Sequence, residues 1–227
     1  MESNVSHCVD DAFDCGQGLI SPPIQQWPRF EPALRLGVMA SGNGSNFEAI
    51  QKAIAADRLN ADIRQLVVNN PGCGAAQRAE RLHLPCQVLD HRLFQSRESL
   101  DRALLKVFLD SDVELVVMAG WMRIVTPVLI NAFPERLLNL HPSLLPSFRG
   151  LNAVAQALQA SVRVSGCTAH LVDLDVDTGP IIAQAVVRVD SDDTVQTLAK
   201  RIQFQEHRLY PWAIALTGMR WRQLSSL

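Results

Sequence analysis

Hydrophobic positions along the chain follow two patterns: short apolar runs, and longer stretches in which apolar residues recur every three or four positions. The short runs predict buried strands and the helical spacing predicts amphipathic helices. Strands are predicted at 34–40, 63–68, 86–89, 115–118, 137–140, 168–172 and 181–187. Helices are predicted at 47–56, 74–82, 97–109, 126–132 and 151–160, and from 194 toward Tyr210-Pro211.

The alternation of these strands and helices indicates an α/β fold with a doubly wound, mostly parallel sheet. The run 115–118 is apolar at every position, which is typical of a central strand buried on both faces. The last two predicted strands favour an antiparallel extension of the sheet near the C-terminus. Residues 1–33 show no such periodicity and contain two proline-rich turns. We therefore expect an N-terminal tail, disordered or draped over the surface, followed by one domain at 34–227.

Composition narrows the class of protein. With 227 residues, 48% of them hydrophobic, the chain is long enough to bury one sizeable core. A formal net charge of -2 provides no basic field for nucleic acid, and no apolar run approaches the roughly 20 residues of a membrane helix. The start of the chain lacks the basic and apolar regions of a secretory signal, and the five scattered cysteines include no CxxC pair. We expect a cytoplasmic protein with free thiols and no nucleic-acid or membrane partner.

Polar side chains follow three of the predicted strands. The segment Ser41-Gly42-Asn43-Gly44-Ser45-Asn46 follows the first, 120–123 follows the central one, and Asn139 and His141 end the strand at 137–140. Ligands on doubly wound sheets bind at the C-terminal ends of the strands. These three segments are therefore expected along one edge of the sheet.

The glycine-rich segment 41–46 admits two interpretations. A strand, a glycine-rich turn and a helix together direct backbone N–H groups and a positive helix end at an anion, and Ser45 and Asn46 can add donors or cap the helix. The segment matches neither the P-loop nor the GxGxxG fingerprint. A plain turn between strand and helix explains the same residues, so the pattern leaves both a phosphate site and an ordinary turn open.

Asn139 and His141 stand two residues apart on a strand, so their side chains point to the same side. An amide that stabilises an oxyanion beside an imidazole that transfers a proton suits chemistry at a carbonyl group. The acidic loop 173–180 can bring a carboxylate to the imidazole. The turn residues after Asp177 favour that acid, but spacing does not decide between it and Asp173 or Asp175.

Other chemistries find less support. His170 lies within a predicted strand, where a hydrogen-bonded core histidine is expected. No cluster of Cys and His has metal-ligand spacing, and Ser143 lies in no GxSxG elbow. Proton transfer with oxyanion stabilisation, as in acyl transfer between two bound substrates, is the chemistry that these residues favour.

Five motifs together resemble the phosphoribosylglycinamide formyltransferase family. They are Ser41-Gly42-Asn43-Gly44-Ser45-Asn46, Met122-Arg123-Ile124, Asn139-Leu140-His141-Pro142-Ser143-Leu144-Leu145-Pro146, Asp177-Thr178-Gly179-Pro180 and Gln205-Glu206-His207. The likeness runs from about residue 34 to about residue 212. It implies a Rossmann-like formyltransferase fold and transfer of a formyl group from 10-formyltetrahydrofolate, as co-substrate, to the amine of glycinamide ribonucleotide in de novo purine biosynthesis. No metal is implied, and the chain is expected as a monomer or homodimer.

The resemblance also implies roles for individual residues. Asn139 and His141 would stabilise the oxyanion, His141 would donate a proton, and Asp177 would favour the charged imidazole. The positions that match the ribonucleotide-binding residues of the family are Gly44, Ser45, Asn46, Pro142 and Glu206. The positions that match its folate-binding residues are Arg97, Met122, Arg123, Ile124, Val125 and Asn139. The two-proline loop, together with the likeness, predicts a cis peptide at Leu145-Pro146.

Three alternatives share part of this pattern. Formyltetrahydrofolate hydrolase has the same trio but, by family resemblance, an N-terminal regulatory domain for which the tail is too short. Methionyl-tRNA formyltransferase is expected to carry a further C-terminal domain and a basic surface. A non-catalytic nucleotide-binding module needs only the 41–46 loop and has no use for Asn139, His141 and Asp177. The sequence departs from the family pattern in two ways. Many family members lack the tail before residue 34, and some have other residues at 147–149 and 165–167.

Overall fold

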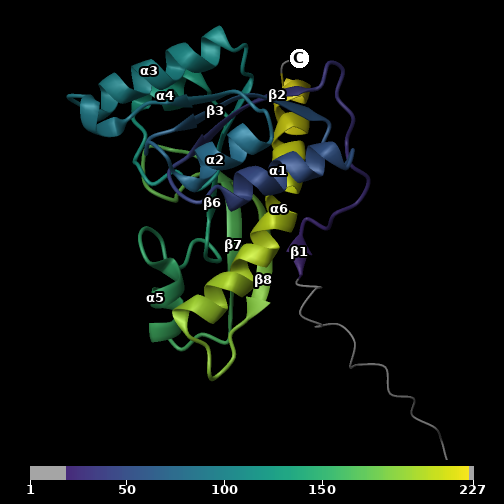
Figure 1. Ribbon diagram of the computed structural model, residues 1–227. Helices are drawn as coiled ribbons and strands as arrows, with labels where there is room; N and C mark the ends of the chain where they lie inside the picture. Colours follow the sequence, from purple (N-terminus) through teal and green to yellow (C-terminus); the bar gives the residue numbers. More distant parts are fainter. Residues whose placement is uncertain (1–18, 225–227) are drawn as a thin grey trace, which may run out of the picture.

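The computed structural model describes residues 19–224, and Figure 1 shows one mixed sheet with helices packed on both faces. The strand order is β1-β8-β7-β6-β5-β2-β3-β4. The strands are β1 (Ile20–Ser21), β2 (Leu34–Ala40), β3 (Ala61–Val68), β4 (Cys86–Val88), β5 (Leu115–Met118), β6 (Leu137–His141), β7 (Val164–Leu171) and β8 (Ile181–Arg188). The helices are α1 (Ser45–Ala55), α2 (Gly74–Arg81), the 3-10 helix η1 (His91–Leu93), α3 (Arg97–Asp110), α4 (Pro127–Ala132), α5 (Ala153–Gln159) and α6 (Val195–Leu224).

The central part of the sheet is parallel and one end is antiparallel. β2 pairs in parallel with β3 and β5, β3 pairs with β4, and β5 pairs with β6. β7 pairs antiparallel with β6 and with β8, and β1 pairs antiparallel with β8. The predicted fold class, including the antiparallel extension near the C-terminus, is confirmed.

Successive residues of β2 belong to two different hydrophobic cores, as they must in a sheet that is covered on both faces. Leu36 and Val38 join the larger cluster, which also contains apolar residues of α1, α2 and α6. Met39, with Val67 of β3, joins a second cluster with apolar residues of α3 and the α4 region. Because these side chains are fully buried on both faces, β2 is held firmly between β3 and β5, and the loop that follows it starts from a fixed point.

Several elements differ from the predicted ranges by one or two residues, and two, α6 and β7, extend well beyond them. α6 does not stop near Pro211 but continues to Leu224, with the proline inside the helix. Proline removes one backbone hydrogen bond, but the buried side chains of Tyr210 and Trp212 hold this part of the helix on the core. β7 begins at Val164, four residues before the predicted start, because Gly166 allows close approach to β8: a Cβ there would lie 1.9 Å from the Ala185 carbonyl oxygen.

Residues 19–28 lie against β8 and the middle of α6, and residues 29–33 contact the turn after α1 and the end of α6. Ile20 pairs with Ala185, and the Trp27 ring meets the Trp212 ring edge-on at 5.2 Å between centroids. Trp212 Nε1 donates to the Pro22 carbonyl at 3.1 Å. This part of the N-terminal segment is thus attached by a short strand pairing and an aromatic contact, while residues 1–18 lie outside the described residues.

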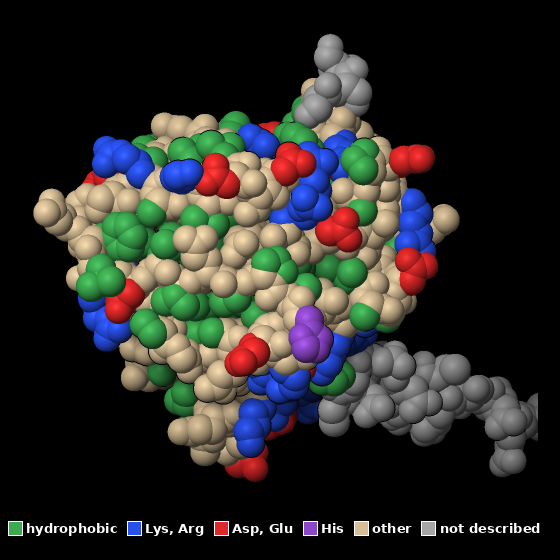
Figure 2. Space-filling model, turned by 45° about the horizontal axis from the view of Figure 1, so that its top comes forward, with side chains coloured by type: hydrophobic (Ala, Val, Ile, Leu, Met, Phe, Trp, Pro, Cys, Tyr) green, Lys and Arg blue, Asp and Glu red, His purple; other side chains and the backbone are tan. Residues whose placement is uncertain are grey.

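The surface carries charges of both signs. Figure 2 shows basic and acidic side chains interspersed on one face, with hydrophobic side chains in small separate groups between them. Within residues 19–224, no helix combines the length and the apolar character needed to cross a membrane.

Candidate active site

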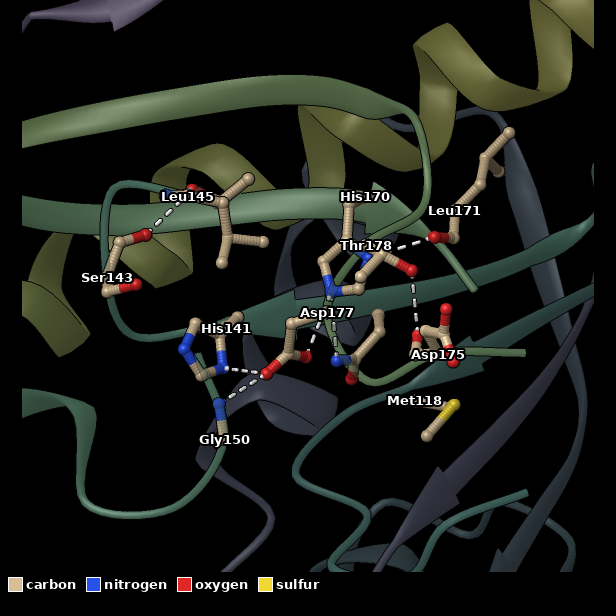
Figure 3. Close-up of polar contacts among 12 residues, drawn as sticks. Met118, His141, Ser143, Leu145, Gly150, His170, Leu171, Asp175, Asp177 and Thr178 are labelled. Atoms are coloured by element: carbon tan, nitrogen blue, oxygen red, sulfur yellow. Dashed lines mark hydrogen bonds and ion pairs between the residues drawn. The ribbon is translucent and has the colours of Figure 1, made fainter. Parts of the chain in front are cut away.

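His141, the last residue of β6, is held between two hydrogen-bond acceptors. Its Nδ1 lies 3.2 Å from Asp177 Oδ2 (Figure 3). Its Nε2 lies 2.8 Å from the carbonyl oxygen of Phe148. Both the His141 and the Asp177 side chains are 7% exposed. A neutral imidazole can donate to only one of these acceptors, whereas the imidazolium donates to both. The local geometry therefore suits a charged imidazole.

Asp177 is placed by a tight turn. It has a φ of 55°, and the backbone N–H of Gly150 donates to its Oδ2 at 2.8 Å. A Cβ at Gly179 would lie 1.9 Å from the Leu171 carbonyl oxygen, so only glycine lets this loop fold back closely onto the end of β7. This turn directs the Asp177 carboxylate toward His141.

The other two acids of the loop lie elsewhere. Asp173 is exposed, and its Oδ1 accepts a hydrogen bond from the Leu174 N–H at 2.7 Å. Asp175 is also exposed, and its carbonyl oxygen accepts from Thr178 Oγ1. The choice that spacing left open is therefore decided: Asp177 is the acid that contacts His141.

His170 joins Asn139 to Asp177. The register of β6 and β7 pairs residue 139 with residue 170. His170 Nε2 lies 3.2 Å from Asn139 Nδ2 and 3.5 Å from Asp177 Oδ1, while Nδ1 lies 2.8 Å from the Leu171 carbonyl oxygen. With Nδ1–H donating to that carbonyl, Nε2 faces both the Asn139 amide and the Asp177 carboxylate. In the neutral ring Nε2 accepts from the amide and orients it, and in the charged ring Nε2–H donates to the carboxylate.

The sequence interpretation of His170 as a buried, hydrogen-bonded core residue describes its burial correctly, but two of its partners are Asn139 and Asp177. No local sequence pattern predicts that His170 contacts these two residues. It follows from the pairing register of β6 and β7, in which Asn139 and His170, 31 positions apart in sequence, lie side by side.

The electrostatics of Asp177 follow from these neighbours. Burial of the carboxyl opposes its ionisation, but the hydrogen bonds from His170 and the Gly150 N–H, with the charges of His141 and His170, outweigh burial and lower the pKa of Asp177. The carboxylate is therefore the stable form next to the two imidazoles.

The 41–46 loop leaves the first turn of α1 open. Gly44 is the N-cap residue, with a φ of 77°, and no side chain caps the helix. A Cβ on Gly44 would lie 2.5 Å from Ala75 Cα, so both the backbone conformation and the packing require glycine here. Unpaired N–H groups at a helix N-terminus form a site for an anion.

Ser45 and Asn46 use their side chains for contacts with α6 and do not cap α1. Ser45 Oγ accepts from Gln203 Nε2 at 3.1 Å, and Asn46 Nδ2 donates to Glu206 Oε2 at 3.0 Å. Burial raises the pKa of the Glu206 carboxyl against the opposing hydrogen bond from Asn46. Two of the predicted ribonucleotide-binding positions, 46 and 206, thus contact each other directly.

A cavity of about 490 Å³ opens over this loop. Its lining includes all of residues 41–46, with Gly120, Met122 and Arg123 from the loop after β5. Ser41 joins the two loops: its N–H donates to the Gly120 carbonyl at 3.1 Å, and its Oγ accepts from the Met122 N–H at 2.9 Å. The predicted phosphate loop and part of the predicted folate loop therefore share one cavity.

The loop between β5 and α4 is anchored a second time at its far end. The Thr126 N–H donates to Asp101 Oδ2 of α3 at 2.5 Å, and Asp101 is 2% exposed. Between the two anchors the side chains of Met122 and Ile124 are 72% and 51% exposed, whereas Val125 is buried. The backbone of this loop is fixed while its apolar side chains remain open to a ligand.

The remaining predicted positions lie around the same edge. Pro142 is half-buried directly after His141, and Arg97 is exposed at the first turn of α3. The Leu145-Pro146 bond is cis, as expected. The order β2-β5-β6 places the three polar segments on neighbouring strand ends, as predicted. Across the described residues, His, Cys, Asp and Glu form no group of three that would hold a metal ion.

Comparison with known proteins identifies relatives over nearly the whole organised chain. The sequence profile of the family described as formyl transferase matches residues 34–214. The chain is 39% identical over 180 residues to the phosphoribosylglycinamide formyltransferase of Bacillus subtilis, covering 79% of this chain and 92% of the relative. It is 39% identical over 184 residues to the human trifunctional purine biosynthetic protein adenosine-3, of which it spans only 18% while 81% of this chain is covered.

Solved structures agree. The phosphoribosylglycinamide formyltransferase of Bacillus halodurans superimposes with a TM-score of 0.77 at 40% identity, covering 82% of this chain and 94% of that one. Glycinamide ribonucleotide transformylase 1 of Symbiobacterium toebii gives 0.80 at 41% identity, covering 82% and 88%. The overall fold is thus shared with these two structures.

Proposed function

Because the chain belongs to the formyl transferase family, we propose that it transfers the formyl group of 10-formyltetrahydrofolate to the amine of glycinamide ribonucleotide. The observation that carries the proposal is the buried contact of 3.2 Å between His141 Nδ1 and Asp177 Oδ2, next to Asn139. The names of the bacterial relatives, which match this chain along most of their own length, support the choice of substrates.

The proposed reaction begins when the amine attacks the formyl carbon and its carbonyl oxygen becomes an oxyanion. The free N–H of the Asn139 amide and the His141 imidazolium donate hydrogen bonds to that oxygen, where charge develops. Nδ1 of His141 contacts Asp177, so Nε2 is the ring atom that donates to the substrate. To do so, Nε2 gives up its contact with the Phe148 carbonyl oxygen.

Collapse of the intermediate breaks the bond between the formyl carbon and N10 of the folate. The leaving nitrogen takes a proton and the attacking amine gives one up, so His141 is restored without net proton change. Asp177 stabilises the imidazolium and, through water, assists the proton transfer. No nucleophilic side chain and no metal are part of this scheme.

The two substrates would occupy neighbouring parts of the strand edge. The open N-terminus of α1, with Gly44, Ser45 and Asn46, suits the phosphate of the ribonucleotide. Glu206, which contacts Asn46, and Pro142 would border the rest of the ribonucleotide. The anchored backbone at 122–125 suits the pteridine, with Asn139 beside it, and Arg97 suits the glutamate of the folate. The free thiols of Cys73, Cys86 and Cys167 suit a reducing compartment such as the cytoplasm.

The decisive experiment compares glycinamide ribonucleotide, initiator tRNA and water as formyl acceptors for the purified protein, without added metal. We expect formylglycinamide ribonucleotide as the product. Formate release at an equal rate with no amine present would identify a hydrolase instead. Formylation of the tRNA in preference to the ribonucleotide would overturn the proposed acceptor.

A further inference from the structure

The cavity over the 41–46 loop contains a histidine that the proposed mechanism does not use. Fourteen residues line this cavity, and none of them is acidic. Two can carry a positive charge: Arg123, from the loop after β5, and His91, from η1. A cavity with cationic side chains, an open helix N-terminus and no carboxylate is suited to an anion.

His91 is fixed in the cavity wall by the backbone directly after β3. Its Nδ1 lies 3.1 Å from the carbonyl oxygen of Asn69, the residue that follows β3 and is 1% exposed. The next residue, Asn70, donates from Nδ2 to the Ser41 carbonyl at 2.7 Å, which ties this wall to the 41–46 loop. With Nδ1–H used by a carbonyl, Nε2 is the ring atom left for a ligand.

Two buried acceptors among the lining residues lack partners. Asn46 Oδ1 and Asn69 Oδ1 are shielded from solvent, and neither accepts a hydrogen bond from the described residues. Buried polar atoms are nearly always paired with protein, water or ligand. Both atoms indicate that a hydroxyl-bearing or hydrated ligand completes the cavity.

The charge on the imidazole decides what it can bind. The neutral ring presents Nε2 as an acceptor, which repels an anion, whereas the imidazolium presents a charged N–H donor. The charged groups around His91 are Asp90 and Arg92 of its own turn, which pair with each other at 2.7 Å, and Arg123. Asn69 and Asn70, which follow β3, and the residues of the 41–46 loop line the cavity and are uncharged.

We propose that protonated His91 binds an anionic group of a substrate in this cavity. That group is the phosphate of the ribonucleotide or a carboxylate of an oligoglutamate tail on the folate. The inference depends on the proposed function only for the identity of these two ligands, because the anion-binding chemistry is a property of the cavity itself.

Direct binding tests the inference independently of turnover. Calorimetric titration of glycinamide ribonucleotide and of folate mono- and triglutamate is done at pH 6 and pH 8.5 on the wild-type protein, His91→Ala, His91→Lys and Leu93→Ala. Leu93 is the matched control, since it lies in the same 3-10 helix but is 82% exposed and outside the cavity lining.

At pH 6, His91→Ala is expected to weaken binding of one ligand by about ten- to a hundredfold, the range of a hydrogen bond to a charged group. The loss should be much smaller at pH 8.5, and His91→Lys should bind with less dependence on pH. If His91→Ala weakens binding of the ribonucleotide, the group that His91 binds is the phosphate. If it weakens binding of the triglutamate relative to the monoglutamate, that group is a carboxylate of the oligoglutamate tail.

Affinities of His91→Ala within twofold of the wild type for all ligands at pH 6 would overturn the inference. A wild-type protein that binds both ligands but forms no formylglycinamide ribonucleotide would contradict the proposed function and leave the binding result valid. The two failures are thereby separated.

Discussion

His141 Nδ1 and Asp177 Oδ2 lie 3.2 Å apart, in side chains that are both 7% exposed, although the two residues are 36 positions apart in the sequence. One residue ends a central parallel-paired strand and the other sits in a left-handed turn after the antiparallel strand β7. The parallel core of the sheet and its antiparallel extension therefore meet at the candidate active site. Each part provides one member of the pair.

The first prediction concerns that carboxylate. Asp177→Asn is expected to lower kcat by about 10²- to 10⁴-fold, the range attributed to positioned acid–base groups, because an amide does not stabilise the imidazolium. Asp175→Asn is the control, since Asp175 lies in the same loop but is exposed. A kcat for Asp177→Asn within threefold of the Asp175→Asn value would remove Asp177 from the mechanism.

The second prediction concerns the pH dependence of stability. The pKa of Asp177 is lowered in the folded protein, so its contribution to the free energy of unfolding is fully present above its unfolded pKa of about 3.9 and is lost as pH falls through the lower folded value. Urea unfolding from pH 7 to pH 3 should therefore show a stability difference between wild type and Asp177→Ala that is constant above about pH 5 and shrinks below pH 4. A difference that grows on acidification would contradict the sign of the shift.

The third prediction assigns a positioning role to His170. Since its ring orients the Asn139 amide at 3.2 Å, His170→Ala should lower kcat about tenfold with little change in either KM. If His170 acts through Asn139, the double variant His170→Ala/Asn139→Ala should be no slower than Asn139→Ala alone. Additive losses would show instead that His170 acts mainly through Asp177 or on the substrate directly.

Local patterns were sufficient for the elements that make up most of the sheet. The strands at 34–40 and 115–118 have the predicted bounds, because buried strands are short uninterrupted apolar runs between polar turns. The placement of three polar segments on one edge followed from the general rule for such sheets. These features need no knowledge of long-range pairing.

The parts that sequence did not predict depend on contacts between distant residues. Glycine is unfavourable inside strands, yet Gly166 lies in β7 because the β8 backbone comes too close there for any side chain. Pro211 lies inside α6 because buried neighbours outweigh the lost hydrogen bond. The link from Asn139 through His170 to Asp177 is set by the β6–β7 register, which a single sequence does not encode in any local signal.

The fourth prediction compares two glycines of the 41–46 loop. Gly44→Ala places a Cβ 2.5 Å from Ala75 Cα at a φ of 77°, and should cost on the order of 2 kcal/mol of stability and raise the KM for the ribonucleotide more than tenfold. A Cβ at Gly42 meets no atom within 4 Å, so Gly42→Ala is the control for stability. Equal melting temperatures for the two variants would show that the loop adapts to a side chain at 44.

The last prediction concerns the N-terminal segment that precedes β2. Trp27 is partly buried against the core and meets Trp212 at 5.2 Å between ring centroids. Removing a fully buried Trp costs about 3–5 kcal/mol, so Trp27→Ala should cost about 2 kcal/mol and lower Tm by roughly 4–8 °C. Ile24→Ala, at a residue of the same segment with 36% exposure, should change Tm by less than about 2 °C. Because Trp27 and its neighbours contact β8, the turn after α1 and α6, and the hydrogen bonds of His141 and Asp177 involve none of them, kcat of Trp27→Ala at 20 °C should equal that of the wild type. A lower kcat with an unchanged Tm would show that the segment acts on the active site and not on the stability of the sheet edge.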